Sequence, residues 1–170
     1  IKGADLAMYH AKSNGRGGAV LFEARMLEEQ EEKRQLESDL RLAVQHSQFE
    51  LFYQPLIDIK SRAITGFEAL IRWPHPTRGL MSPEIFIPLA EETGLINQLG
   101  AWVLREACRD ALNWDGIALS VNISAAQLHN PEFPIQLGQI LEETGFDPER
   151  LELEITETCL VLDPVVAERS

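Results

Sequence analysis

Two neighbouring runs decide the fold: FELFYQPLIDI at residues 49–59 and AITGFEALIRW at residues 63–73. Both are rich in the β-branched and aromatic side chains that favour strands. Only residues 60–62 separate them, and this gap is too short for the crossover connection that parallel strands need. The sequence therefore predicts an antiparallel hairpin at the start of a sheet.

After this hairpin, helical and strand-like patterns alternate. Ser82 as N-cap, Pro83 at the first helical position and Gly94 beyond the end delimit one helix. This alternation is typical of a parallel sheet covered by helices, and a complete eight-stranded barrel takes about 250 residues. We therefore expect an α/β fold, a partial TIM-like (β/α) barrel with an antiparallel first strand. The further elements expected are helices at 82–94 and 95–114, a strand at 117–124, a largely helical stretch at 125–145 and a strand at 150–157.

The residues before the hairpin divide into two segments. Residues 1–22 combine a short helical pattern with a brief strand, which is too little to enclose a core, so we expect the tail of a larger domain. Residues 23–35 begin a charged stretch without Gly or Pro, typical of a solvated connector helix. Residues 36–170 then form the second domain.

Composition limits the classes of function. The 170 residues include 27 acidic and 15 basic side chains, a net charge of −12, which disfavours general binding to DNA or RNA because phosphates require clustered Lys and Arg. Two cysteines, Cys108 and Cys159, fit a reducing compartment, and we expect a cytoplasmic location for this segment. No apolar run reaches the roughly 18 residues of a membrane span, so no membrane contact is expected from it.

Polar residues interrupt three predicted strands near their carboxyl ends, where barrels of this type carry their active sites. They are Glu68, Asn122 and Glu154. Two carboxylates and an amide oxygen form a ligand set that suits Mg²⁺ or Mn²⁺. The alternative is a half-exposed strand whose acidic side chains lie in water, and spacing alone leaves both interpretations open.

Several motifs then occur in the order typical of one family. The chain resembles the EAL domains of bacterial cyclic di-GMP phosphodiesterases from about Leu36 to its end. The motifs are Glu68-Ala69-Leu70 with Arg72-Trp73, Tyr53-Gln54-Pro55, His75-Pro76 with Gly79, Ser82-Pro83 with Phe86-Ile87-Pro88-Leu89-Ala90-Glu91, Val121-Asn122-Ile123-Ser124, and Glu154-Ile155-Thr156-Glu157.

The resemblance implies a role for individual residues. Glu68, Asn122 and Glu154 match metal-binding positions, and the two glutamates are the catalytic residues among them. Gln54, Leu70 and Arg72 match positions that contact the substrate, with Arg72 expected on a phosphate. Two further positions complete the set: Pro88 lies in the helix that flanks a guanine, and Glu157 supports a loop.

The implied reaction is metal-dependent hydrolysis of cyclic di-GMP to linear pGpG in bacterial signal transduction. The resemblance also implies Mg²⁺ or Mn²⁺ as cofactor and a homodimer formed through the EAL domain.

Residues 4–16 resemble the last helix of a GGDEF, or diguanylate cyclase, domain. This implies a GGDEF–EAL tandem whose other segments could include a membrane anchor. The family's paired aspartates, catalytic lysine and last metal-binding glutamate should follow residue 170. We therefore expect residues 1–170 alone to neither fold nor hydrolyse the substrate. A non-catalytic cyclic di-GMP receptor and a purely structural or dimerising piece are the alternatives.

Overall fold

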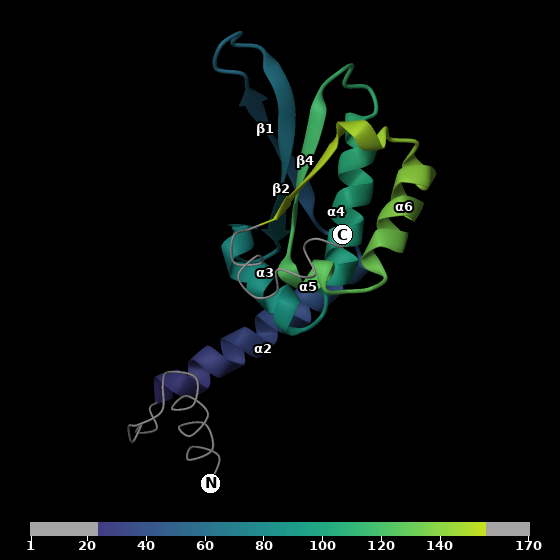
Figure 1. Ribbon diagram of the computed structural model, residues 1–170. Coiled ribbons are helices and arrows are strands. Elements are labelled where there is room, and N and C mark those ends of the chain that lie inside the picture. The colour runs from purple at the N-terminus through teal and green to yellow at the C-terminus, as the bar shows by residue number, and fades with distance from the viewer. Residues whose placement is uncertain (1–23, 156–170) are drawn as a thin grey trace, which may run out of the picture. The chain divides into compact units, whose positions relative to one another are not determined.

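The computed structural model describes residues 24–155 (Figure 1). Five strands form a single sheet, and helices alternate with its later strands. The elements are α2 (Ala24–Gln45), β1 (Glu50–Ile57), β2 (Ile64–His75), β3 (Gly79–Met81), α3 (Pro83–Glu92), α4 (Ile96–Ala111), β4 (Ala118–Ile123), α5 (Ala125–Leu128), α6 (Phe133–Thr144), the 3-10 turn η1 (Pro148–Arg150) and β5 (Leu151–Ile155).

The sheet has the order β1-β2-β4-β5, with the short β3 paired to β2. Strands β1 and β2 are antiparallel, whereas β2 with β4 and β4 with β5 are parallel. The turn between β1 and β2 is closed by the Asp58 carboxylate, which accepts hydrogen bonds from the backbone N–H and the hydroxyl of Ser61. The predicted antiparallel first strand and the parallel strands after it are confirmed, whereas closure into a TIM-like barrel stays a prediction.

The strand β2 extends beyond its predicted end and turns back into β3. Trp73 pairs with Met81 and His75 with Gly79, which has a positive φ of 72°. The buried His75 closes this turn, because its Nδ1 accepts hydrogen bonds from the backbone N–H groups of Thr77 and Arg78. This small hairpin was not predicted, since prolines at positions 74 and 76 mask the strand pattern.

The helix boundaries follow the local sequence. Helix α3 begins at Pro83 after the extended Ser82 and ends before Gly94, whose φ of 73° stops it as predicted. The predicted helical stretch 125–145 is divided into α5 and α6, and residues 129–132 between them are not helical. Asn130 and Pro131 lie in this break, and Pro is strongly disfavoured inside a helix.

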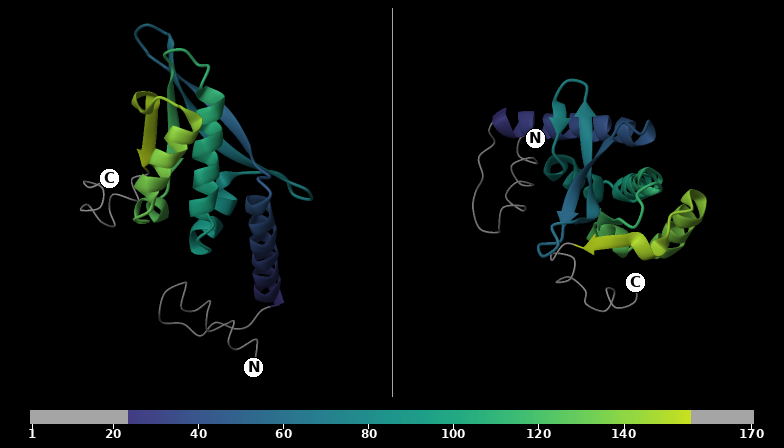
Figure 2. Two further views of the ribbon diagram at one scale, coloured as in Figure 1. Left: turned by 90° about the vertical axis from the view of Figure 1, so that its right-hand side faces the viewer. Right: turned by 90° about the horizontal axis from the view of Figure 1, so that it is seen from above.

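Helices α4 and α6 cover one face of the sheet (Figure 2). Their apolar side chains meet Leu119, Val121 and Ile123 of β4 in a core that also contains the fully buried Cys108. Burial raises the pKa of the Cys108 thiol to about 11, so this cysteine is an inert core residue.

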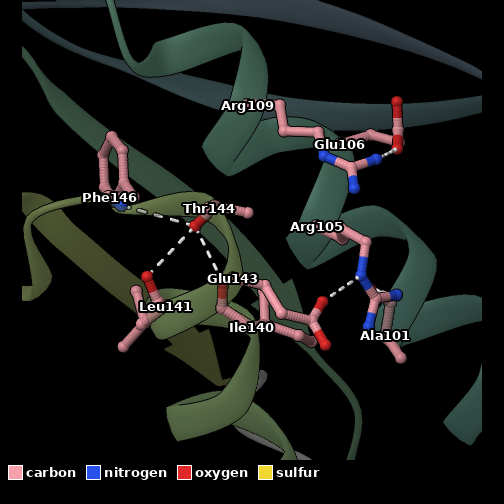
Figure 3. Close-up of polar contacts among 9 residues, drawn as sticks. All are labelled: Ala101, Arg105, Glu106, Arg109, Ile140, Leu141, Glu143, Thr144 and Phe146. Atoms are coloured by element: carbon pink, nitrogen blue, oxygen red, sulfur yellow. Dashed lines mark hydrogen bonds and ion pairs between the residues drawn. The ribbon is translucent and has the colours of Figure 1, made fainter.

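Polar contacts hold α6 in place at its end and along its exposed side (Figure 3). Arg105 of α4 forms an ion pair with Glu143 of α6 at 2.9 Å. The Thr144 hydroxyl donates to the Ile140 carbonyl at 2.8 Å and accepts from the Phe146 N–H, which closes the last turn. The chain then leaves α6 through Gly145, with a φ of 70°, towards β5.

Helix α2 is mainly polar and exposed up to residue 35, as the charged composition of residues 23–35 predicts, whereas Leu40 and Ala43 in its second half are buried. Gln35 donates to Asp39 and Arg41 pairs with Glu37, both contacts between exposed side chains four residues apart. No helix within residues 24–155 is long and apolar enough to cross a membrane. Helix α2 continues without a break across residue 36, where the second domain is predicted to begin.

Arg150 links the end of α4 to the start of β4. Its guanidinium donates to the carbonyl oxygens of Ala111 and Ile117, both at 3.0 Å, and to that of Trp114. The same group lies over the Phe146 ring, 4.8 Å from its centre. These contacts satisfy the carbonyl groups of the α4–β4 connection and position the strand that follows.

Replacing Arg150 with methionine keeps much of the side-chain volume and removes these donors. We expect Arg150→Met to lower the free energy of unfolding by about 2–3 kcal/mol, since hydrogen bonds from charged groups stabilise strongly. Arg109→Met is the matched control, because Arg109 makes an exposed ion pair with Glu106, and such pairs contribute less than about 1 kcal/mol. Urea denaturation of a protein that carries the complete EAL domain measures both, and equal losses would contradict the proposed role.

Candidate functional site

The sheet face opposite the helix-covered core carries a row of polar side chains. In-register partners on neighbouring strands project to the same face of a sheet. Gln54 pairs with Glu68, Glu68 with Ser120, and Ser120 with Glu152, so one row crosses four strands. The Ser120 hydroxyl, which is fully buried, donates to the Glu152 carboxylate at 3.3 Å.

A second polar pair lies two residues nearer the carboxyl ends of β4 and β5. Asn122 and Glu154 are in-register partners on β4 and β5. The Asn122 Nδ2 donates to Glu68 Oε1 at 2.7 Å, although the two residues are 54 positions apart in sequence. The structure thus brings Glu68 and Asn122 into contact and places Glu154 beside Asn122 on the same face.

These three residues are compatible with a hard divalent cation. Within residues 24–155 no group of three His, Cys, Asp or Glu side chains is close enough to hold a metal ion, so two carboxylates must be supplemented by an amide. Donation from Nδ2 leaves the Asn122 Oδ1 as the ligand atom, and the donor set is then entirely oxygen. Mg²⁺ is commonly bound by one or two carboxylates together with water and substrate phosphates.

A cavity of about 580 Å³ adjoins Asn122. It lies between the carboxyl ends of β2 and β4, helix α3, the first half of α4 and the start of α5. Leu70 and Pro88, two of the predicted substrate-binding residues, line it together with Ile87, Leu99 and other mainly apolar side chains. Its size and lining are typical of sites for small organic ligands.

Arg72 lies two residues beyond Leu70 on β2, outside the cavity lining. Its guanidinium stacks over the Phe52 ring at 5.6 Å from the ring centre, and its Nη1 donates to the Ile71 carbonyl at 2.8 Å. Among residues 24–155 no salt bridge to Arg72 is found.

Tyr53 anchors strand β1 from the opposite face. Its hydroxyl donates to the Asp110 carboxylate of α4 at 2.6 Å, and its ring meets Trp114 edge to face at 4.9 Å. Burial, assisted by the Asp110 carboxylate, raises the pKa of the Tyr53 phenol well above its usual value, so the hydroxyl remains a donor. Since neighbouring side chains alternate, this anchor directs Gln54 towards the polar face.

The alternation in LELEITE predicts that Glu152 shares a face with Glu154, and the structure places Glu152 in the polar row. Sequence reasoning did not identify Ser120, because only its register with Glu68 indicates its position. Glu157, the predicted loop support, lies outside the described residues.

Comparison with known proteins shows the family of the chain. The family model for the EAL domain matches residues 37–168. The chain belongs to the EAL domain family. It is 48% identical over 161 residues to an uncharacterized signaling protein of Caulobacter vibrioides, a match that covers 94% of this chain and 20% of that protein.

Two further matches concern the protein MucR. The bifunctional diguanylate cyclase/cyclic di-GMP phosphodiesterase MucR of Pseudomonas aeruginosa is 43% identical over 165 residues, covering 94% of this chain and 24% of MucR. The solved structure of the phosphodiesterase PaMucR in complex with c-di-GMP superposes with a TM-score of 0.74 at 39% identity, covering 79% of this chain and 58% of that one. This EAL chain therefore spans only about a quarter or less of the length of these curated relatives.

The Asn122–Glu68 contact predicts a metal-linked change in stability. In Asn122→Asp the side chain can no longer donate, so two carboxylates face each other in the metal-free protein. In a protein that carries the complete EAL domain, we expect the melting temperature in EDTA to fall by a few degrees at pH 7. Added Mn²⁺ should raise the melting temperature of the variant more than that of the parent protein.

Asn113→Asp is the control for this experiment, because Asn113 is exposed in the turn after α4. Calorimetric melts with and without Mn²⁺ measure the effect. A variant whose response to Mn²⁺ equals that of the control would show that Asn122 does not face a cation.

Proposed function

We propose that this EAL chain belongs to a metal-dependent phosphodiesterase that hydrolyses cyclic di-GMP to linear pGpG. The observation that carries the proposal is the contact between Glu68 and Asn122 beside Glu154, on the same sheet face and next to a 580 Å³ cavity. The structural similarity to PaMucR with bound c-di-GMP supports the same substrate.

In this proposal Glu68, Asn122 and Glu154 hold Mg²⁺ or Mn²⁺, with the two glutamates as catalytic residues. A divalent ion there supplies the positive charge that a reacting phosphodiester requires and acidifies water. Glu68 is oriented by the amide of Asn122, so its carboxylate is positioned before any ligand arrives. Such preorganisation lowers the cost of assembling the site.

The remaining side chains would bind the nucleotide. Leu70 and Pro88 offer apolar surface to a base at the wall of the cavity. Arg72, whose guanidinium lies over the Phe52 ring, would donate to a phosphate, and Gln54 lies beside Glu68 on the neighbouring strand. Glu157 would support a loop beyond the described residues.

We also infer the context of the domain. The EAL match begins at residue 37, whereas the match to bifunctional MucR takes in 94% of the chain and so extends into the residues before it. This favours a GGDEF domain ahead of the EAL domain, with residues 1–22 as its tail and residues 23–35 as the connector. A homodimer formed through the EAL domain and a cytoplasmic location remain predictions of the same proposal.

The decisive experiment changes Glu68 to Gln within a protein that carries the complete EAL domain. Glutamine still accepts the hydrogen bond from Asn122 but lacks the charge that holds a cation. We expect the rate of pGpG release to fall by more than about 100-fold. This exceeds the roughly 10- to 100-fold loss that follows when a residue that only orients a metal ligand is removed. The melting temperature in EDTA should stay unchanged. Glu142→Gln, on the exposed side of α6, is the matched control.

The same assay tests the alternative of a receptor without catalysis. Binding of cyclic di-GMP by the parent protein without pGpG release in Mg²⁺ or Mn²⁺ would contradict the enzyme and favour the receptor. Turnover by Glu68→Gln at the parent rate would remove Glu68 from the catalytic residues.

Arg72→Ala tests the phosphate contact. Loss of a charged hydrogen-bonding group is worth about 1.5–3 kcal/mol, so we expect about 10- to 100-fold weaker binding of cyclic di-GMP, a larger effect than the change in folding stability. Titration calorimetry in EDTA, which prevents turnover, measures the affinity. Arg109→Ala, from the exposed part of α4, should leave it unchanged, and unchanged affinity in Arg72→Ala would exclude Arg72 from the site.

A further inference from the structure

We propose that Gln127 is a positioning residue for the metal site, and that it acts on Asn122 through the carboxyl end of β4. The inference rests on the proposed function, since it concerns the cation held by Glu68, Asn122 and Glu154. Gln127 lies in α5, five residues beyond Asn122, and only 3% of it is exposed.

A reciprocal pair of hydrogen bonds fixes the junction between β4 and α5. The Ser124 hydroxyl accepts from the Gln127 backbone N–H at 3.3 Å, while the Gln127 side-chain Oε1 accepts from the Ser124 backbone N–H at 3.2 Å. Such a capping box defines the direction in which a chain enters a helix. Here the fixed N–H of Ser124 belongs to the second residue after Asn122.

The side-chain amide of Gln127 is held against the backbone of α4 at Gly100. A Cβ atom at position 100 would lie 1.9 Å from the Gln127 Nε2 and 2.6 Å from its Cδ, so any other residue there must displace the amide. Glycine is thus required at position 100 for this close approach, not for an unusual φ angle. The contact connects the end of β4 to a long helix of the core.

The consequence concerns the orientation of Asn122. Ile123, the next residue, is buried in the core beneath the sheet, so the strand end is held by Ile123 on one side and by the capping box beyond it. Asn122 itself is exposed and bonds to Glu68. Loss of the Gln127 contact would leave the backbone after Asn122 free to shift, and the amide oxygen would move away from the cation.

The same residues also line the ligand cavity. Gly100, Asn122, Ser124 and Gln127 all contribute to its wall. Gln127 therefore connects core packing with the geometry of the cation site.

The experiment measures Mn²⁺ affinity in a protein with the complete EAL domain, by electron paramagnetic resonance of free Mn²⁺ at a temperature well below melting. We expect Gln127→Ala and Gly100→Ala each to weaken Mn²⁺ binding about 10-fold, the lower end of the effect of residues that orient metal ligands. In the double variant the added methyl group meets no amide. Its Mn²⁺ affinity should therefore equal that of Gln127→Ala alone.

Two controls separate positioning from stability. Gly138→Ala places a methyl group in α6, where no atom lies within 4 Å, and should leave Mn²⁺ affinity unchanged. Ile140→Val trims a fully buried core residue, so it should lower the melting temperature without changing Mn²⁺ affinity.

The outcomes distinguish the inference from the function on which it rests. A parent protein that binds no Mn²⁺ overturns both. Normal Mn²⁺ binding by the parent and by Gln127→Ala overturns the positioning role alone. Additive losses in the double variant show that Gly100 acts independently of Gln127 and likewise overturn it. If Gly100→Ala fails to fold, Gln127→Ala decides by itself.

Discussion

In-register pairing of β2, β4 and β5 is the constraint on which the rest of the site depends. Because side chains alternate along each strand, one register places Glu68, Ser120, Asn122 and Glu154 together on one face and sends Ala69, Val121 and Leu153 into the core. A shift of one residue in β4 would exchange these faces. It would bury Asn122 under α4 and expose Val121. Packing of the apolar face therefore also determines which side chains lie on the polar face.

The strand β4 is held at both ends by contacts outside the sheet. At its start, Arg150 donates to the carbonyl oxygen of Ile117 and to two carbonyls at the end of α4. At its far end, Ser124 and Gln127 close the capping box against Gly100. Both anchors attach to α4, the helix that also receives the Tyr53 hydrogen bond from β1 through Asp110. Helix α4 therefore aligns the strands that present Gln54 and Asn122.

Local patterns in the sequence were sufficient to predict much of the fold. The three-residue gap between the first two strands predicted their antiparallel pairing, and Ser82, Pro83 and Gly94 marked the ends of α3. The hairpin with β3 was missed because a three-residue strand beside two prolines is too short to show an alternation of apolar and polar residues. The break between α5 and α6 was indicated by Pro131, but helical periodicity on both sides masked it.

The site was predictable only in part for a related reason. Alternation within LELEITE and polar residues at strand ends select Glu68, Asn122 and Glu154 as candidates, whereas the hydrogen bond between Glu68 and Asn122 depends on register across 54 residues. Gly100 and Gln127 carry no local signal, because their contact arises only when α5 packs on α4. Tertiary contacts of this kind are outside what a period of 2 or 3.6 residues can indicate.

The charge of the chain explains why the proposed site needs both a cation and Arg72. With a net charge of −12 and three glutamates on the polar face, the protein alone would repel a phosphodiester. The carboxylates that repel the substrate are the same groups that attract a divalent ion, and their charge is then neutralised where the phosphate must lie. Arg72 adds a positive charge four residues beyond Glu68 on β2, where its guanidinium lies over the Phe52 ring and donates to the Ile71 carbonyl. In this proposal, an acidic surface repels phosphates except where a bound cation and Arg72 supply positive charge, which would favour a ligand that carries phosphate.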